Sequence, residues 1–279
     1  LPNMNDPSSD FKRLVNSIID QWPEKSKGEI TSDLHILQKL QDTLRKGNWK
    51  VTVALRKFNR IVEIWPGFKD NIYGIALDLG STTISTHLVN LHSGKTIGSK
   101  GKMNPQIKYG EDLMSRVSYV MMNQNGEKEL ANIVRQGIQE IIIDVANENE
   151  IDFKDILEIT FVGNPVMHHL LLGINPIELG GAPFALSIEN SLECLSSEIN
   201  INLNPGTRLL ALPCIAGHVG ADAAAATLAE EIYKKSEISL IIDIGTNAEI
   251  ILGNKTSLLA ASSPTGPAFE GAQIICGQR

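Results

Sequence analysis

Two helical patterns open the chain. Apolar residues from Phe11 onward recur at helical spacing, and Ser9 or Asp10 precedes them as a candidate cap. A second helix is predicted from about Ser32 to Gly47. Its residues expected to face inward are Leu34, Leu37, Leu40 and Leu44. The following segment, WKVTVALRKFNRIVEIWPG, predicts two short strands, so residues 1–70 are expected to form a small α+β unit.

Beyond Asp70 the pattern changes to apolar strands that alternate with helices. Strands are predicted at 73–79, 83–91, 96–102, 156–164 and 208–216. Helices are predicted at 112–123, 127–148, 165–172 and 221–234. The stretch 174–206 is rich in Pro, Gly and Asn and is expected to be irregular. The fold class predicted from this alternation is α/β.

The chain repeats one short pattern at about the length of a domain. GIALDLGSTTIST begins at Gly74 and LIIDIGTNAEIIL begins at Leu240. Both run from an apolar strand into Asp, an apolar residue, Gly and a hydroxyl residue, so that Asp243 repeats Asp78. Two copies of one strand-turn-strand pattern are much stronger evidence of a site than a single copy.

The repeated turns have the chemistry to bind a nucleotide polyphosphate between them. Glycine lets an anion approach the backbone, where N–H and hydroxyl groups supply donors. The predicted phosphate contacts are Gly80, Ser81, Thr82, Thr83, Gly245, Thr246 and Asn247. Like charges repel, so Asp78 and Asp243 are instead predicted to hold Mg²⁺ or to orient an attacking water. The alternative is a pair of Asx turns that satisfy only local N–H groups.

Further residues are candidates for the same site. Asn164 ends a buried strand, where its amide could reach the phosphates or cap the next helix, and both interpretations stay open. Asp222 follows a strand-to-helix junction and could equally be a first-turn carboxylate that interacts favourably with the helix dipole. The residues considered for cleft or partner contacts are Gly217, Asp222, Ser262, Ser263, Gly266 and Glu270, the last four in a loop and helix start. The segment NPQIKYGEDLMSRV, with Arg116, is interpreted as a contact between domains rather than a site.

Composition excludes several classes of protein. The formal net charge of −7, with no basic run, argues against nucleic acid and anionic membranes as partners. No apolar stretch is long enough to predict a membrane span. The cysteines lie far apart, so neither a zinc site nor an iron–sulfur motif is predicted, and a cytoplasmic setting fits best. The start, LPNMNDPSSD, lacks an initiator Met and a signal pattern, which favours a fragment of a longer protein.

The two turns resemble the phosphate motifs of the superfamily that joins actin, sugar and acetate kinases and heat-shock ATPases (ASKHA). DLGSTT is similar to its first phosphate motif, DIGTNAEI to its second, and FVGNPVMHHLLLG to the segment that connects them near the cleft. The resemblance implies a ribonuclease-H-like fold in which two halves close on Mg-ATP. ATP and Mg²⁺ are the cofactors that it implies.

A closer resemblance, to the reductive activators of corrinoid-dependent enzymes, covers nearly the whole chain. It rests on YGIALDLGSTT, NPQIKYGEDLMSRVSY, FVGNPVMHHLLLG, LPCIAGHVGADAAAA, IIDIGTNAEI and SSPTGPAFEGAQIICGQR. It implies an ATPase that uses hydrolysis to drive an electron uphill and return Co(II) corrinoid on a partner protein to Co(I). The implied partners are a corrinoid protein or a corrinoid-dependent methyltransferase and an electron donor, and a homodimer stays open.

The chain departs from that family in two ways. No ferredoxin-type cysteine cluster precedes residue 70, so a two-iron, two-sulfur cluster is expected only in an absent N-terminal domain. The chain stops where the second half of the fold should continue. Residues 1–70 are therefore assigned to a small α+β middle domain, 71–236 to the first ATPase subdomain, and 237–279 to the truncated start of the second. Activity of this piece alone is in doubt.

Two functions from other classes remain as alternatives. A small-molecule kinase of the same superfamily would need a carboxylate base, a role for which Asp222 is available. An actin-like protein would use the nucleotide to drive assembly rather than chemistry. Nucleotide-dependent sedimentation separates the assembly protein from the two enzymes.

Overall fold

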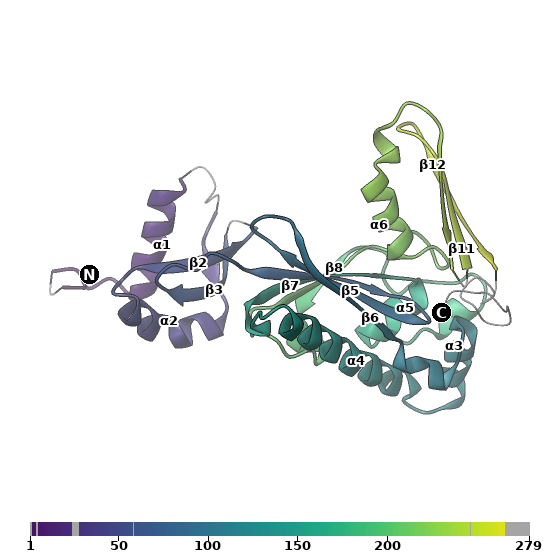
Figure 1. Ribbon diagram of the computed structural model, residues 1–279, viewed down its shortest axis with the longest axis horizontal. Coiled ribbons are helices and arrows are strands. Elements are labelled where there is room, and N and C mark those ends of the chain that lie inside the picture. Colours follow the sequence, from purple (N-terminus) through teal and green to yellow (C-terminus); the bar gives the residue numbers. More distant parts are fainter. Residues whose placement is uncertain (1, 4, 24–27, 58, 246, 266–279) are drawn as a thin grey trace.

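The computed structural model describes residues 2–3, 5–23, 28–57, 59–245 and 247–265 and arranges them around three sheets (Figure 1). The amino-terminal unit packs two helices on a small sheet of strand order β1–β3–β2. Its elements are α1 (Asp10–Gln21), β1 (Thr31–Ser32), α2 (Leu34–Lys46), β2 (Val51–Arg56) and β3 (Arg60–Pro66). The two helices and the β2–β3 pair are confirmed predictions, and Ser9 caps α1 by accepting from the backbone N–H of Lys12.

The buried face of α2 differs from the one predicted. Leu34 and Leu37 are 69% and 44% exposed, whereas Ile36 and Leu40 are buried. Ile36, Leu40, Thr43 and Leu44 recur at the spacing of a single helical stripe, and this stripe packs on β3 and α1. Two overlapping apolar stripes were available in the sequence, so only the position of the neighbouring sheet decided between them.

A mixed sheet of strand order β6–β5–β4–β7–β9–β8 forms the centre of the molecule. Strands β4, β7 and β9 are parallel, while β5, β6 and β8 run antiparallel to their neighbours. The strands are β4 (Tyr73–Leu79), β5 (Thr83–Asn90), β6 (Thr96–Met103), β7 (Ile156–Gly163), β8 (Leu192–Leu195) and β9 (Arg208–Ala211). The helices and 3₁₀ turns between them are η1 (Pro105–Tyr109), α3 (Leu113–Met122), α4 (Gly126–Glu148), η2 (Phe153–Asp155), α5 (Pro165–Leu172), η3 (Ile177–Gly180) and η4 (Ser196–Ile199).

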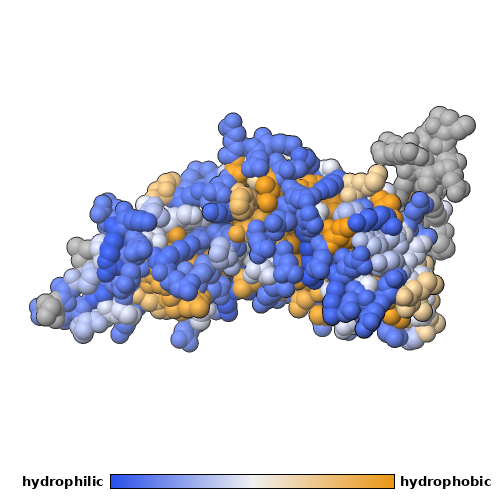
Figure 2. Space-filling model, turned by 90° about the horizontal axis from the view of Figure 1, so that it is seen from below, coloured by the Kyte–Doolittle hydropathy of each residue, from blue (hydrophilic) through white to orange (hydrophobic). Residues whose placement is uncertain are grey.

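The main core lies between this sheet and the long helix α4, which Figure 1 shows running beneath the strands. Leu130, Val134 and Ile138 lie on one stripe of α4 and are fully buried. Each such side chain contributes about 1.5–3 kcal/mol on burial. Figure 2 views the molecule from below, where hydrophilic side chains cover most of the surface. The described part of the chain contains no helix with the length and apolarity needed to cross a membrane.

Three elements differ from the sequence prediction. The stretch expected to be irregular contributes β8, which pairs with β9 at the edge of the sheet. The strand predicted at 208–216 already ends at Ala211, two residues before Pro213, which has no N–H to donate to a ladder. The helix predicted at 221–234 ends four residues early, because Glu231 adopts a left-handed backbone with φ of 51°.

A third sheet, β10–β11–β12, is an antiparallel meander that follows α6. The elements of this part are α6 (Ala221–Glu230), η5 (Ile232–Lys234), β10 (Ser239–Ile244), β11 (Asn247–Gly253) and β12 (Leu258–Pro264). Helix α6 packs on β10 and β11 through Ala223, Ile241 and Ile251. In Figure 1 this sheet stands on the side of α6 away from the amino-terminal unit, near the tips of β5 and β6.

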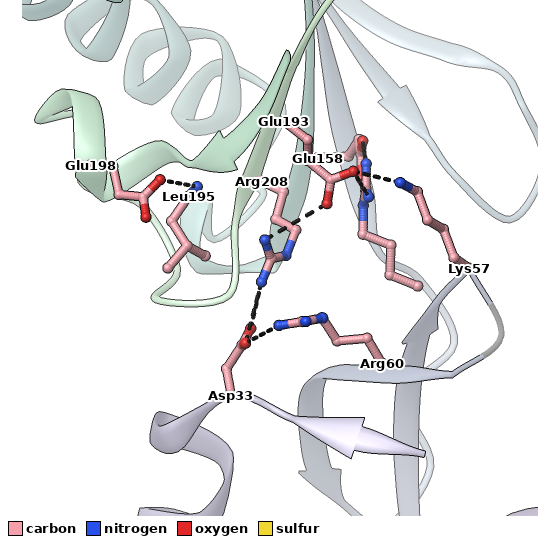
Figure 3. Close-up of polar contacts among 9 residues, drawn as sticks. Asp33, Lys57, Arg60, Glu158, Glu193, Leu195, Glu198 and Arg208 are labelled. Carbon is pink, nitrogen blue, oxygen red and sulfur yellow. Dashed lines mark hydrogen bonds and ion pairs between the residues drawn. The ribbon is translucent and has the colours of Figure 1, made fainter. Parts of the chain in front are cut away.

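Ion pairs join the amino-terminal unit to the end of the central sheet where β7 and β9 begin (Figure 3). Arg56 binds both carboxylate oxygens of Glu158 on β7, at 3.0 Å from Nε and 2.7 Å from Nη2. Arg208 on β9 binds Asp33 at 3.0 Å. These side chains are only 11–24% exposed, so water screens the pairs weakly. The amino-terminal unit is therefore held in a fixed position on the central sheet.

We expect Glu158→Ala to lower the free energy of unfolding by about 2 kcal/mol, because it removes the bidentate partner of the mostly buried Arg56 and leaves Glu193 as its remaining carboxylate. Urea unfolding measures this loss. The matched control is Glu140→Ala, which removes the exposed partner of Lys102 and should cost less than about 0.5 kcal/mol. Equal losses in both variants would contradict the assignment of a structural role to the Arg56–Glu158 pair.

Candidate functional site

The first repeated turn connects β4 to β5 at the carboxyl end of β4. The N–H of Gly80 donates to the carbonyl of Thr83 at 2.9 Å, which closes a tight loop. A Cβ at position 80 would lie 3.0 Å from that same carbonyl oxygen, so the loop favours glycine. Ser81 is buried, whereas Thr82 and Thr83 keep surface exposed to solvent. The predicted strand-turn-strand is confirmed, and phosphate binding at its residues stays a prediction.

The second turn is the β10–β11 hairpin. The N–H of Gly245 donates to the carbonyl of Asn247 at 2.8 Å, and the hydroxyl of Thr265 donates to the carbonyl of Gly245 at 2.7 Å. Thr246 lies outside the described residues, as do Gly266 and Glu270. Asp243 stands opposite Glu249 in the antiparallel pairing of the hairpin. Both turns are closed by the N–H of a glycine, but the first closes onto the third residue after the glycine and the second onto the second residue after it.

Four carboxylates from four elements lie near enough to influence one another electrostatically: Asp78 on β4, Asp222 on α6, Asp243 on β10 and Glu249 on β11. Asp78 keeps exposed surface, but the surrounding protein removes part of the hydration of its carboxylate, and this effect, together with repulsion from Asp222 and Asp243, raises its pKa to about 6. The same three causes raise the pKa of Glu249 to about 7. Burial also raises the pKa of Asp222, with Asp243 adding to the effect. The charges of Asp222 and Asp243 therefore raise the pKa of other carboxylates in this group.

A divalent cation fits this environment. Asp78 and Asp243 keep surface exposed to solvent, so that a ligand can reach them. Within the described ranges no three carboxylate, imidazole or thiol groups are close enough to hold a metal by themselves. Mg²⁺ usually takes one or two carboxylates and completes its shell with water and substrate phosphates, and its charge would relieve the repulsion. The residues present therefore suit a magnesium ion that binds together with a phosphate ligand.

Asn164 lies beside the first turn, where β7 ends and α5 begins. Its Oδ1 accepts from the N–H of Met167 at 3.0 Å, so it is the cap of α5, and Pro165 occupies the first helical position. Its amide nitrogen has no partner among the residues that the structure describes. The cap interpretation is confirmed, and a contact between the amide and a ligand remains a prediction.

Close backbone packing brings α6 to the same place. A Cβ on Gly220 would lie 2.6 Å from the carbonyl oxygen of Gly163 and 2.6 Å from Cα of Asn164. Glycine thus allows the first turn of α6, with Asp222, to approach the end of β7. Gly217 packs instead against Phe184, whose carbonyl oxygen would lie 2.1 Å from an added Cβ. Packing accounts for Gly217 without a ligand.

Ser262 and Ser263 lie on β12 rather than in the loop and helix start that the sequence predicted, so that expectation was wrong. The Pro and Gly residues that suggested a loop begin only at the end of this strand. Ser262 stands opposite Glu249 and donates to its Oε1 at 3.3 Å. Because side chains alternate along a strand, Ser263 points to the other face of the sheet. Of the two serines, the structure brings only Ser262 to the carboxylates.

Two functional candidates were missed in the sequence. Glu249 lies inside the recognised motif DIGTNAEI. The register of the hairpin places Glu249 opposite Asp243, and this register could have identified Glu249 as a candidate. Arg116 was assigned to a contact between domains, but its guanidinium lies under the first turn and donates to the carbonyl of Ser81. Its segment lies on α3, far from the turn in sequence, so only the tertiary structure reveals this contact.

Comparison with known proteins places these features in one family. Residues 1–71 match the model described as the RACo linker region, residues 73–235 the RACo middle region, and residues 237–279 the C-terminal domain of RACo, the ASKHA domain. The chain is 31% identical over 251 residues to a protein of Eubacterium limosum named "Corrinoid activation enzyme RamQ". It is 25% identical over 224 residues to the "[Co(II) methylated amine-specific corrinoid protein] reductase" of Methanosarcina barkeri.

These alignments cover 89% and 74% of the chain, but only 42% and 38% of the two relatives. A solved structure, "Reductive activator for corrinoid,iron-sulfur protein", superimposes on the whole chain with a TM-score of 0.89 and 34% identity, over 44% of its own length. The mixed α/β fold is thus that of a reductive activator with an ASKHA domain, preceded by a linker domain. The chain belongs to the RACo family of proteins.

Proposed function

We propose that the protein is an ATP-dependent activator that reduces the Co(II) corrinoid of a partner protein to Co(I). Two of its relatives are named for activating or reducing corrinoid proteins, and a solved structure of similar fold is named as a reductive activator. The observation that carries the proposal is the repeated turn: Asp78 and Asp243 each stand at the end of a strand, directly before a turn that the N–H of a glycine closes.

The residues of the site suit transfer of the terminal phosphoryl group of ATP to water. This reaction needs positioning and neutralisation of charge more than covalent chemistry from the protein. Backbone N–H groups and hydroxyls of the two turns would bind the phosphate oxygens, while Asp78 and Asp243 would hold a Mg²⁺ ion that neutralises the phosphoryl charge. Glu249, whose pKa of about 7 lies near neutral pH, would orient or deprotonate the attacking water.

The reaction that we propose is hydrolysis of ATP to ADP and phosphate, coupled to transfer of one electron to cobalt. The electron would come from an iron–sulfur domain or a separate donor, since the chain carries no cysteine cluster of that kind. A corrinoid protein or a corrinoid-dependent methyltransferase would be the partner. Hydrolysis would supply the free energy for the uphill electron transfer.

The test is ATP hydrolysis by the full-length gene product with and without a Co(II) corrinoid protein from the same source. We expect the Co(II) form to stimulate turnover and the methylated form to leave it unchanged, because only the Co(II) form needs reduction. Equal turnover with both forms would contradict the proposal and favour a kinase or an assembly protein. Nucleotide-dependent sedimentation would then distinguish between those two.

A further inference from the structure

Arg116 is a buried cation without a carboxylate partner in the described part of the chain. It is the bulkiest of the fully buried side chains, with an exposed fraction of 0%. Burial lowers the pKa of its guanidinium to about 10, and Asp112 opposes this effect only through space. A buried charge without a counter-charge costs several kcal/mol. A residue of this kind therefore calls for an explanation beyond packing.

The four polar contacts of Arg116 all go to neutral groups. Its Nε donates to the carbonyl of Gly110 at 3.0 Å, and its Nη1 contacts Oε1 of Gln106 at 3.4 Å and Sδ of Met167 at 3.0 Å. Its Nη2 donates to the carbonyl of Ser81 in the first turn. These contacts fix the guanidinium plane but leave its positive charge without compensation.

Asn104 donates hydrogen bonds to the carbonyls on either side of the Ser81 carbonyl. Its Nδ2 donates to the carbonyl of Gly80 at 2.9 Å, and its backbone N–H donates to the carbonyl of Thr82 at 2.8 Å. Asn104 is fully buried and directly precedes η1. Three successive carbonyls of the first turn are thus bound from the interior by Asn104 and Arg116.

This arrangement decides which way the turn directs its N–H groups. In a planar trans peptide the N–H points opposite to the C=O of the same peptide. The N–H groups of Ser81, Thr82 and Thr83 therefore point away from Asn104 and Arg116. A donor on the carbonyl also polarises the peptide and strengthens its N–H as a donor. The charge of Arg116 lies behind the turn, on the side opposite to these N–H groups.

We propose that Arg116 is a positioning residue for phosphate binding at the first turn. Arg116 orients the turn through the carbonyl of Ser81, and its positive charge would be compensated by a phosphate bound there. The inference rests on the proposed function, in which this turn binds the polyphosphate of ATP. It also assigns a role to the segment NPQIKYGEDLMSRV, whose residues Asn104, Gln106 and Arg116 form one buried support beneath the turn.

The test compares Arg116→Met with Arg135→Met in the full-length gene product. Arg135 is a matched control, because its Nε also donates to a backbone carbonyl, that of Leu171 at 2.8 Å, and burial also lowers its pKa. Calorimetry measures the Kd of ATP, tripolyphosphate and adenosine. For Arg116→Met we expect the Kd of ATP and of tripolyphosphate to rise about tenfold, and that of adenosine to stay within about twofold. Arg135→Met should leave all three unchanged.

An unchanged Kd for ATP in a folded Arg116→Met protein would overturn the proposal, as would an equal loss of affinity for adenosine. If Arg116→Met does not fold, Arg116→Lys keeps the charge but cannot span Ser81 and Gly110. We then expect the Kd of ATP to rise about threefold with adenosine unaffected, and no change would overturn the proposal. Failure of the wild-type protein to bind either ATP or tripolyphosphate is a separate outcome, which would overturn the proposed function as well.

Discussion

Replacing Asp78 by Asn should lower Mg-ATP hydrolysis by the full-length gene product at least about a thousandfold. The substitution keeps the shape of the side chain but removes one of the two carboxylates assigned to Mg²⁺. Partial loss of hydration and repulsion from Asp222 and Asp243 raise the pKa of Asp78 to about 6. Steady-state release of phosphate measures the loss.

The same substitution should not destabilise the protein. Asp78 is repelled by Asp222 and Asp243, so a neutral amide relieves that repulsion and should leave the thermal midpoint equal or higher. The control is Asp144→Asn, the same chemical change on the exposed face of α4, which should leave turnover unchanged. Turnover of Asp78→Asn within about threefold of wild type would refute the role of Asp78 in the reaction.

Acid should destabilise the protein through His168. The ring of His168 on α5 is 0% exposed, and within the described part of the chain neither ring nitrogen makes a hydrogen bond of good geometry, although the backbone of Leu212 lies near enough to favour the charged ring slightly. It stacks on Phe161 with a centroid distance of 5.7 Å. Burial, followed by repulsion from His169, lowers its pKa from 6.5 to about 4.

The direction of the pH effect follows from the lowered pKa. As the pH falls below 6.5, the unfolded chain binds a proton at His168 that the folded protein binds only near pH 4. Stability is therefore lost across this window, by roughly 3 kcal/mol for His168 alone. His169, whose pKa burial also lowers, adds to the loss in the same direction.

Urea unfolding at about pH 7 and about pH 4.5 measures this loss, and the variant His168→Leu should remove most of it. The matched control is His87→Leu, because His87 is an exposed histidine on β5 whose Nδ1 lies 2.7 Å from the hydroxyl of Ser99. That variant should keep the pH dependence of the wild type. A pH dependence that is the same in His168→Leu and wild type would show that other groups control acid stability.

Much of the candidate site could be predicted because its signals are local. The repeated Asp, Gly and hydroxyl pattern marked Asp78 and Asp243, and the structure places both at the carboxyl ends of strands beside tight turns. The sequence could not show which side chains from other segments lie near these residues. Glu249 and Ser262 join the carboxylates through strand register, whereas Arg116 reaches the first turn from α3 by donating to the carbonyl of Ser81.

The sequence by itself determined the helices, most of the strands and the two turns, because capping, periodicity and glycine act over a few residues. Helix α5 begins at Pro165 and ends at Leu172, as predicted, and Asn164 and Gly173 cap its two ends. Only the tertiary structure decided which stripe of α2 is buried, that β8 pairs with β9, and which groups surround the turns. These outcomes depend on contacts between segments far apart in the chain. The energies of such contacts cannot be read from the local pattern of residues.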